Sequence, residues 1–148
     1  MSVKPVPEGY HNVVPYLVVA DVAALIEFLQ KVFGAEMREK FTRPDGAIMH
    51  AEVKIGDSII MMGQSSEQSK ARPGMLYIYV PDTDAAYQKA LNAGAASLMA
   101  PADQFYGDRN AGVSDASGNY WWIATHVEDV SKEEMDRRHQ EHAKKQGQ

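Results

Sequence analysis

The chain has 148 residues, 45% of them hydrophobic, which suits one domain or two small fused halves with a core. A formal net charge of -5 argues against a nucleic-acid partner, and the absence of cysteine excludes disulfides, thiolate nucleophiles and cysteine-ligated metals. The N-terminus lacks the apolar segment of a signal peptide, and no run approaches the ~20 apolar residues of a membrane span. We therefore expect a cytoplasmic protein without membrane contacts.

The first half of the chain is expected to form a βαβββ module over residues 12–63. Residues 1–11, which contain proline and glycine, form an extended lead-in. Residues 13–19 have the β-branched density of a strand, and Asp21 then caps a helix that ends at Gly34. The three strands that complete the module are expected at 36–41, 48–55 and 58–62.

The second half repeats this order over residues 75–128, after a polar linker at 64–74. The Gly34-Ala35 pair that follows the first helix recurs as Gly94-Ala95, which sets the register of the repeat. The expected elements are a strand at 75–80, a helix at 85–92, a strand at 96–99 and a hairpin that turns at 115–118.

The last segment, residues 129–148, differs in composition from both halves. Ser131 and Glu134 have the spacing of a capping box, and the helix that follows is charged almost all round. Such a helix is either solvated or docks lightly on a partner subunit. The predicted fold class is therefore α+β, with two βαβββ modules in tandem plus a charged C-terminal helix.

This duplicated unit resembles the vicinal oxygen chelate superfamily of glyoxalases, bleomycin-resistance proteins, fosfomycin-resistance enzymes and extradiol dioxygenases. The motifs that carry the resemblance are the Gly-Ala pairs after the helices and Asp-x-x-Gly-Asn-x-x-x-Ile at 115–123. Residues 16–21, 32–36, 106–109 and 122–126 look most like the PhnB-like branch. The resemblance implies strands curled around a concave face, helices on the convex side, and a cavity between paired modules, often across a homodimer.

The resemblance also implies four positions at which metal-dependent members carry His or Glu ligands. Carried over by motif, these positions are Val14, His50, Met75 and Trp122. Only His50 is a suitable ligand, because valine has no donor atom, indole offers only an N–H, and a thioether suits copper. We therefore expect no metal cofactor. A divalent metal held by other residues is the disfavoured alternative.

Strand alternation predicts that the face shared with these four positions is aromatic, with His50, Glu52 and Lys54 among its polar groups. Apolar walls with a few polar groups are typical of small-molecule sites. The residues expected to bind a ligand are Tyr16, His50, Met62, Tyr77, Tyr79, Tyr106, Arg109, Tyr120 and Trp122. His50 and Glu52 are also the candidates for acid–base catalysis.

Each candidate has a plainer interpretation. A histidine beside a glutamate on a strand is more often a satisfied polar residue than a catalytic one, and Arg109 is more simply explained by a structural ion pair with Asp108. Aromatic residues are common both in cores and in binding sites. Stacking on a ligand and filling a cavity are therefore about equally good interpretations of Trp122 and the tyrosines.

Three functions remain open at this point. The first is a metal-free homodimer that binds a planar or aromatic small molecule. The second is a lyase, isomerase or dioxygenase that uses His50 and Glu52, with or without a metal. The third is a structural module whose cavity is filled by its own side chains.

Overall fold

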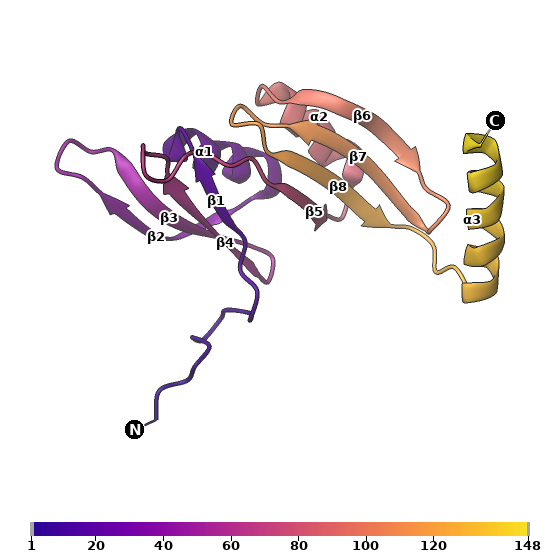
Figure 1. Ribbon diagram of the computed structural model, residues 1–148, viewed down its shortest axis with the longest axis horizontal. Helices are drawn as coiled ribbons and strands as arrows, with labels where there is room; N and C mark the ends of the chain where they lie inside the picture. The colour runs from indigo at the N-terminus through magenta and orange to yellow at the C-terminus, as the bar shows by residue number, and fades with distance from the viewer. Residues whose placement is uncertain (1, 148) are drawn as a thin grey trace.

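The computed structural model describes residues 2–147 and contains two four-stranded sheets that lie side by side (Figure 1). The first module consists of β1 (Tyr16–Val19), α1 (Val22–Phe33), β2 (Glu36–Thr42), β3 (Ile48–Ile55) and β4 (Ser58–Gln64). The second consists of β5 (Met75–Tyr79), α2 (Thr83–Asn92), β6 (Ala96–Asp103), β7 (Asp108–Ser114) and β8 (Tyr120–His126). The helix α3 (Lys132–Gln146) follows. The predicted α+β fold, with two βαβββ modules and a C-terminal helix, is confirmed.

The two sheets have the same topology. Their strand orders are β1-β4-β3-β2 and β5-β8-β7-β6, and in each sheet the first pair is parallel while the other pairs are antiparallel. β6 is longer than predicted and runs through Pro101. A proline is tolerated there because β6 is an edge strand and its pairing with β7 shifts register around this residue.

Local capping explains where the helices begin and end. The Asp21 side chain accepts a hydrogen bond from the backbone N–H of Ala24, and Asp82 caps α2 in the same way. Gly34 ends α1 in the left-handed conformation, with a φ of 67°, which glycine adopts at little cost. The repeated sequence therefore produces repeated helix starts, since Asp21 and Asp82 have the same extended backbone conformation at the two N-caps.

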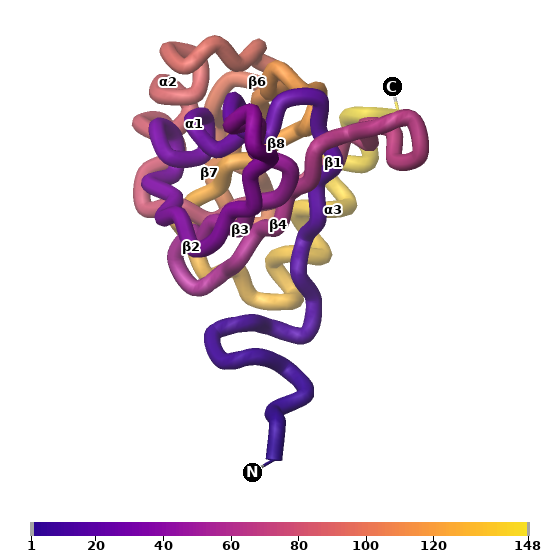
Figure 2. The backbone as a smooth tube through the Cα atoms, turned by 90° about the vertical axis from the view of Figure 1, so that its left-hand side faces the viewer, coloured from indigo at the N-terminus to yellow at the C-terminus, as the bar shows by residue number. Residues whose placement is uncertain are grey.

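One hydrophobic core joins the two modules. It forms where α1 and α2 contact each other and cover one face of the sheets, and Figure 2 shows these helices grouped on one side of the molecule. Trp121 is fully buried there, with its ring centroid 5.5 Å from that of Phe33 at the end of α1. The second module therefore packs the indole of Trp121 against the end of the first helix.

The helix α3 lies at the far end of the second sheet and has no buried residue (Figure 1). Arg138 holds it there through bonds to the Glu128 carboxylate and to the Phe105 carbonyl. The Phe105 ring also contacts the imidazoles of His139 and His142, at centroid distances of 5.7 and 5.1 Å. No helix within residues 2–147 is long and apolar enough to span a membrane.

Asp115 organises the turn between β7 and β8. Its buried carboxylate accepts hydrogen bonds from the backbone N–H groups of Ser117 and Asn119, the Asn119 amide and the Trp121 indole N–H. The turn is thereby connected to the core tryptophan, since the same carboxylate accepts hydrogen bonds from the turn backbone and from the Trp121 indole.

We expect Asp115→Ala to lower the free energy of unfolding by about 3 kcal/mol, because it leaves buried donors on Asn119 and Trp121 without acceptors. Urea denaturation measures this change. Asp136→Ala, at an exposed position of α3, is the control and should shift stability by less than about 0.5 kcal/mol. Equal effects of the two substitutions would contradict this role of Asp115.

Candidate functional site

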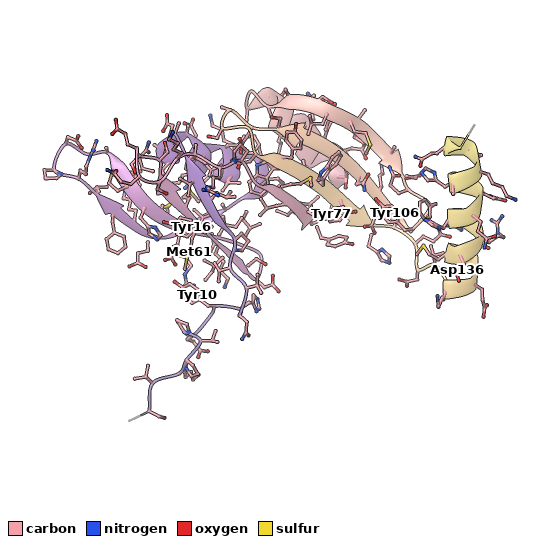
Figure 3. The ribbon with its side chains drawn as sticks, viewed as in Figure 1. Tyr10, Tyr16, Met61, Tyr77, Tyr106 and Asp136 are labelled. Atoms are coloured by element: carbon pink, nitrogen blue, oxygen red, sulfur yellow. The ribbon has the colours of Figure 1, made fainter. Side chains whose placement is uncertain are left out.

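The face of each sheet opposite α1 and α2, called here the open face, carries most of the predicted ligand-binding residues. Tyr16 and His50 lie on it in the first module, and Tyr77 and Trp122 in the second. Met62 does not, because it is fully buried in the core beneath α1. Its neighbour along β4, Met61, pairs with Tyr16 and Glu52 and lies on the open face (Figure 3).

Arg109 also lies away from the open face. Its guanidinium forms a bidentate ion pair with Asp84 of α2, with N–O distances of 2.7 and 2.8 Å. It also donates a hydrogen bond to Asp103 of β6 at 3.2 Å. Along β7, the neighbours Asp108 and Asn110 point to the open face, so alternation sends Arg109 to the helix side. The structural interpretation of Arg109 is therefore correct, but its partners are Asp84 and Asp103 rather than Asp108.

A cavity of about 450 Å³ opens on the second module. Its walls come from β5, β6, β7, β8 and the loop before β7, and the lining residues are Met75, Leu76, Tyr77, Met99, Gln104, Tyr106, Asn110 and Trp122. The Trp122 indole N–H is directed to the Met75 sulfur, 3.0 Å away. This size is within the range of small-molecule sites. Tyr120, which is 43% exposed, shares the open face but does not line the cavity.

The Asp108 carboxylate connects the polar groups beside this cavity. It is 4% exposed and accepts hydrogen bonds from the hydroxyls of Tyr77 at 2.7 Å and Tyr79 at 2.9 Å, while its other oxygen contacts His126 Nδ1 at 2.9 Å. Burial alone disfavours the charged carboxylate, but the bonds from Tyr77, His126 and Tyr79 lower the pKa of Asp108. Burial and the bond to Asp108 raise the pKa of Tyr77, which therefore stays a hydroxyl.

Asn110 has the most unusual environment in the cavity. It is 4% exposed, and its amide nitrogen donates to the hydroxyls of Tyr106 at 2.7 Å and Tyr77 at 3.2 Å. Its Oδ1 is buried and has no hydrogen-bond partner within residues 2–147. A buried carbonyl without a partner costs the fold about 1–3 kcal/mol, and the accessible surface of this one is too small for a ligand in the cavity to reach it.

The first module has a separate polar cluster on its open face. The Glu52 carboxylate is 6% exposed and accepts a bond from the Tyr10 hydroxyl, while its other oxygen lies 3.4 Å from His50 Nε2. The Tyr16 hydroxyl lies 3.2 Å from His50 Nδ1. The lead-in thus contributes Tyr10 to this face, and Arg38 stacks on its ring at 5.4 Å. Figure 3 shows Tyr10, Tyr16 and Met61 on this part of the molecule.

A glycine lies beneath an aromatic ring in each module. A Cβ atom at Gly112 would overlap the Trp122 ring, and one at Gly63 would come within 2.6 Å of the Tyr16 hydroxyl. Both rings therefore lie close against the neighbouring strand, which requires that strand to have no side chain at this point.

Comparison with known proteins assigns the family. A family model described as the Glyoxalase/Bleomycin resistance protein/Dioxygenase superfamily matches residues 10–123. The chain belongs to this superfamily. Proteins of Mycobacterium bovis and Mycobacterium tuberculosis described as uncharacterized are each 33% identical over 132 residues, covering 82% of this chain and 87% and 78% of the relatives.

Solved structures of the glyoxalase/bleomycin resistance/dioxygenase superfamily share the fold. TioX from Micromonospora sp. ML1 has a TM-score of 0.68 at 24% identity, covering 79% of this chain and 99% of that chain. A family enzyme from Burkholderia phytofirmans PsJN has a TM-score of 0.64 at 21% identity, covering 77% of this chain and 97% of that chain. At these identities the likeness shows the fold alone.

The residues at the superfamily's metal-ligand positions do not fit a divalent metal centre. Met75 and Trp122 contact each other through the indole N–H and the sulfur, and Val14 has no donor atom. His50 is engaged by Tyr16 and Glu52. Within residues 2–147 there is no group of three or more His, Asp or Glu side chains arranged to hold a metal ion.

The structure thus divides the predicted site residues into two clusters. Tyr16, His50 and Glu52 lie together in the first module, and Tyr77, Tyr79, Tyr106 and Trp122 in the second. No hydrogen bond or ring contact within residues 2–147 joins the two clusters. Sequence reasoning missed Tyr10, Asp108, Asn110 and the role of His126. Strand alternation from Trp122 across the hairpin is the signal that identifies Asn110 and Asp108 as open-face residues.

We expect His126 to titrate above its ordinary pKa of about 6.5, because the bonds to Asp108 and then Asp129 favour the imidazolium. A raised folded-state pKa stabilises the fold below the unfolded-state value, and this contribution is lost as the pH rises through the folded-state value. Imidazole NMR titration should show the shift, and Asp129→Asn should reduce it.

Urea denaturation between pH 6 and 8 tests the linked change in stability. Wild type should lose more stability than His126→Gln over this range as the pH rises. Parallel curves for the two proteins would rule out the linkage.

Proposed function

We propose that this protein binds a planar or aromatic small molecule in the second-module cavity without using a divalent metal. The observation that carries the proposal is the cavity itself, whose walls include Tyr77, Tyr106 and Trp122 and no charged residue. Aromatic walls with few polar groups favour a flat ligand that stacks on them. The motifs at 106–109 and 122–126 support the PhnB-like branch as the part of the superfamily to which the protein belongs.

Binding is favoured over catalysis because the candidate acid–base groups are already engaged. Both nitrogens of His50 contact protein groups, and both oxygens of Glu52 do so as well. A general base needs a free position within hydrogen-bond reach of the proton that it removes. The third possibility, a filled structural module, is disfavoured by the open volume beside Trp122.

We also propose that the protein forms a homodimer. Large aromatic and sulfur-containing side chains are exposed on both open faces, including Tyr16 at 52%, Phe41 at 56%, Met75 at 68% and Tyr79 at 62%. Exposed apolar side chains that gather in a patch mark interaction sites in soluble proteins. A second copy that places its first-module open face over the second-module cavity would cover both surfaces at once and close the ligand site.

Ligand binding should raise the melting temperature, since a ligand that binds only the native state stabilises it. We expect neutral planar aromatic compounds to give the largest shifts in a thermal-shift panel, and Trp122→Ala to abolish them. Gly112→Ala should weaken binding by about tenfold or more, because the added methyl forces the Trp122 ring away from β7.

Gly63→Ala is the matched control for this experiment. It displaces Tyr16 in the first module by the same kind of overlap. If Gly63→Ala weakens binding and Gly112→Ala does not, the ligand binds to the first module, which contradicts the proposed site. Failure of a broad planar aromatic panel to shift the wild-type protein would contradict the proposal itself.

Light scattering should give a mass of twice 16.4 kDa for the native protein. Phe41→Lys, on the open face of β2, should lower the dimer fraction because it places a charge in the covered surface. Lys40→Glu, on the opposite face of the same strand, is the matched control and should leave the mass unchanged. A single-chain mass at all concentrations would contradict the dimer.

A further inference from the structure

We propose that the C-terminal helix α3 acts on the second-module cavity. Through Arg138 it holds the turn of residues 104–107, called here the cavity turn, in the position that ligand binding requires. Arg138 is a positioning residue, because it is not among the residues that line the cavity. This inference rests on the proposed binding function. It assigns a role to a helix that follows the part of the chain matched by the family model, residues 10–123.

The cavity turn supplies part of the cavity wall. It connects β6 to β7, and its residues Gln104 and Tyr106 both line the cavity. The Tyr106 hydroxyl accepts a hydrogen bond from the Asn110 amide at 2.7 Å, which holds the end of this side chain on the cavity side. The position of the ring also depends on the backbone that carries it, and this backbone is held from the other side.

The backbone of the cavity turn rests on the segment that leads from β8 to α3. The Gly107 carbonyl accepts hydrogen bonds from the backbone N–H groups of Val127 and Glu128, at 2.9 and 3.1 Å. Gly107 has a φ of 99°, and a Cβ atom there would overlap the Glu128 carbonyl oxygen. The two segments therefore lie against each other, so a shift of one moves the other.

Arg138 of α3 connects both segments. Its guanidinium donates two hydrogen bonds to the Glu128 carboxylate, at 2.8 and 2.9 Å, and a third to the Phe105 carbonyl of the cavity turn at 3.1 Å. The planar guanidinium bonds to two partners at once in a fixed geometry, which is the property that distinguishes arginine from lysine. One side chain thus fixes the turn against the segment beneath it.

Ring contacts add to this clamp. The Phe105 ring meets the Tyr106 ring edge-on at a centroid distance of 5.3 Å, and it contacts His139 and His142 of α3 on its other side. Figure 3 shows Tyr106 at the end of the second sheet that faces α3. Because α3 has no buried residue, these contacts and the bonds of Arg138 hold it in place, rather than a hydrophobic interface.

The first module shows the same turn without a clamp. The matching turn between β2 and β3, residues 43–47, is exposed over 43–46. Its hydrogen bonds within residues 2–147 connect only residues of the turn itself. The fold therefore forms this turn without help, and the clamp is found in the module whose turn lines the cavity. A wall segment that is already ordered removes an entropic cost from ligand binding.

Two neighbouring arginines of α3 provide a matched test. Both bond to Glu134, but the hydrogen bonds of Arg137 within residues 2–147 all go to Glu134 and Glu141 of α3 itself. We expect Arg138→Met to weaken naphthalene binding about fivefold or more in a calorimetric titration, because the cavity turn must then be ordered on binding. Arg137→Met should change the affinity by less than about twofold, since methionine and arginine have similar helix propensity.

Amide hydrogen exchange measures the position of the turn without a ligand. In Arg138→Met the amides of Val127 and Glu128, which bond to the Gly107 carbonyl, should exchange about tenfold faster than in wild type. Their change should exceed that of the amide of Ile123, which lies in the core. Arg137→Met should leave the exchange of Val127 and Glu128 as in wild type.

The outcomes separate this inference from the proposed function. Equal naphthalene affinity of wild type and Arg138→Met would overturn the inference and leave the cavity as a binding site. Equal losses in the two arginine variants, or unchanged exchange of Val127 and Glu128 in Arg138→Met, would overturn it as well. No binding of naphthalene to wild type would contradict the proposed function, and the exchange rates would still decide whether Arg138 holds the cavity turn.

Discussion

The buried Asp108 carboxylate is the interaction on which the open face of the second module depends. It accepts hydrogen bonds from the hydroxyls of Tyr77 and Tyr79 and pairs with His126, so β5, β7 and β8 are connected through one side chain. Because Tyr77 has no second proton to give, Asp108 also determines how the Asn110 amide is oriented. A single ionised group thus connects three strands and also determines which atom of the Asn110 amide faces Tyr77.

The two modules use the same device with different partners. In each module a nearly buried carboxylate on the open face forms hydrogen bonds with a tyrosine hydroxyl and a histidine. Glu52 contacts Tyr10 and His50 in the first module, and Asp108 contacts Tyr77 and His126 in the second. The difference lies in where the tyrosine comes from. Tyr10 belongs to the segment before β1, whereas Tyr77 belongs to the sheet itself. The second open face is therefore preorganised by its own strands, and the first depends on the N-terminal arm.

The sequence predicted the elements well because their signals are local. Asp21, Gly34 and Ser131 each act within one helical turn, so a short window contains all the information. The phase of a strand is harder to read where both faces are apolar. Residues 59–62 are two isoleucines followed by two methionines, so alternation does not distinguish the faces there, and Met62, which was predicted to bind a ligand, lies in the core while Met61 lies on the open face.

The missed residues depend on contacts between distant parts of the chain. Asp108 acquires its role from Tyr77, 31 residues earlier, and from His126, 18 residues later. Arg109 was predicted to bind a ligand, but its partner Asp84 comes from the start of α2. Nothing in the residues around position 109 indicates this pairing. Composition and periodicity thus predicted which face is aromatic, but not which polar groups on it are satisfied.

This distinction between satisfied and unsatisfied groups decides the interpretation of the site. His50 and Glu52 are the strongest candidates for catalysis in the sequence, yet the side chain of each forms hydrogen bonds with other protein groups. Asn110 looks ordinary in the sequence, yet it contains the buried acceptor without a partner. A buried acceptor of this kind costs the fold about 1–3 kcal/mol. The contacts made within the fold, rather than the residue types in the sequence, therefore decide which of these groups could take part in binding or catalysis.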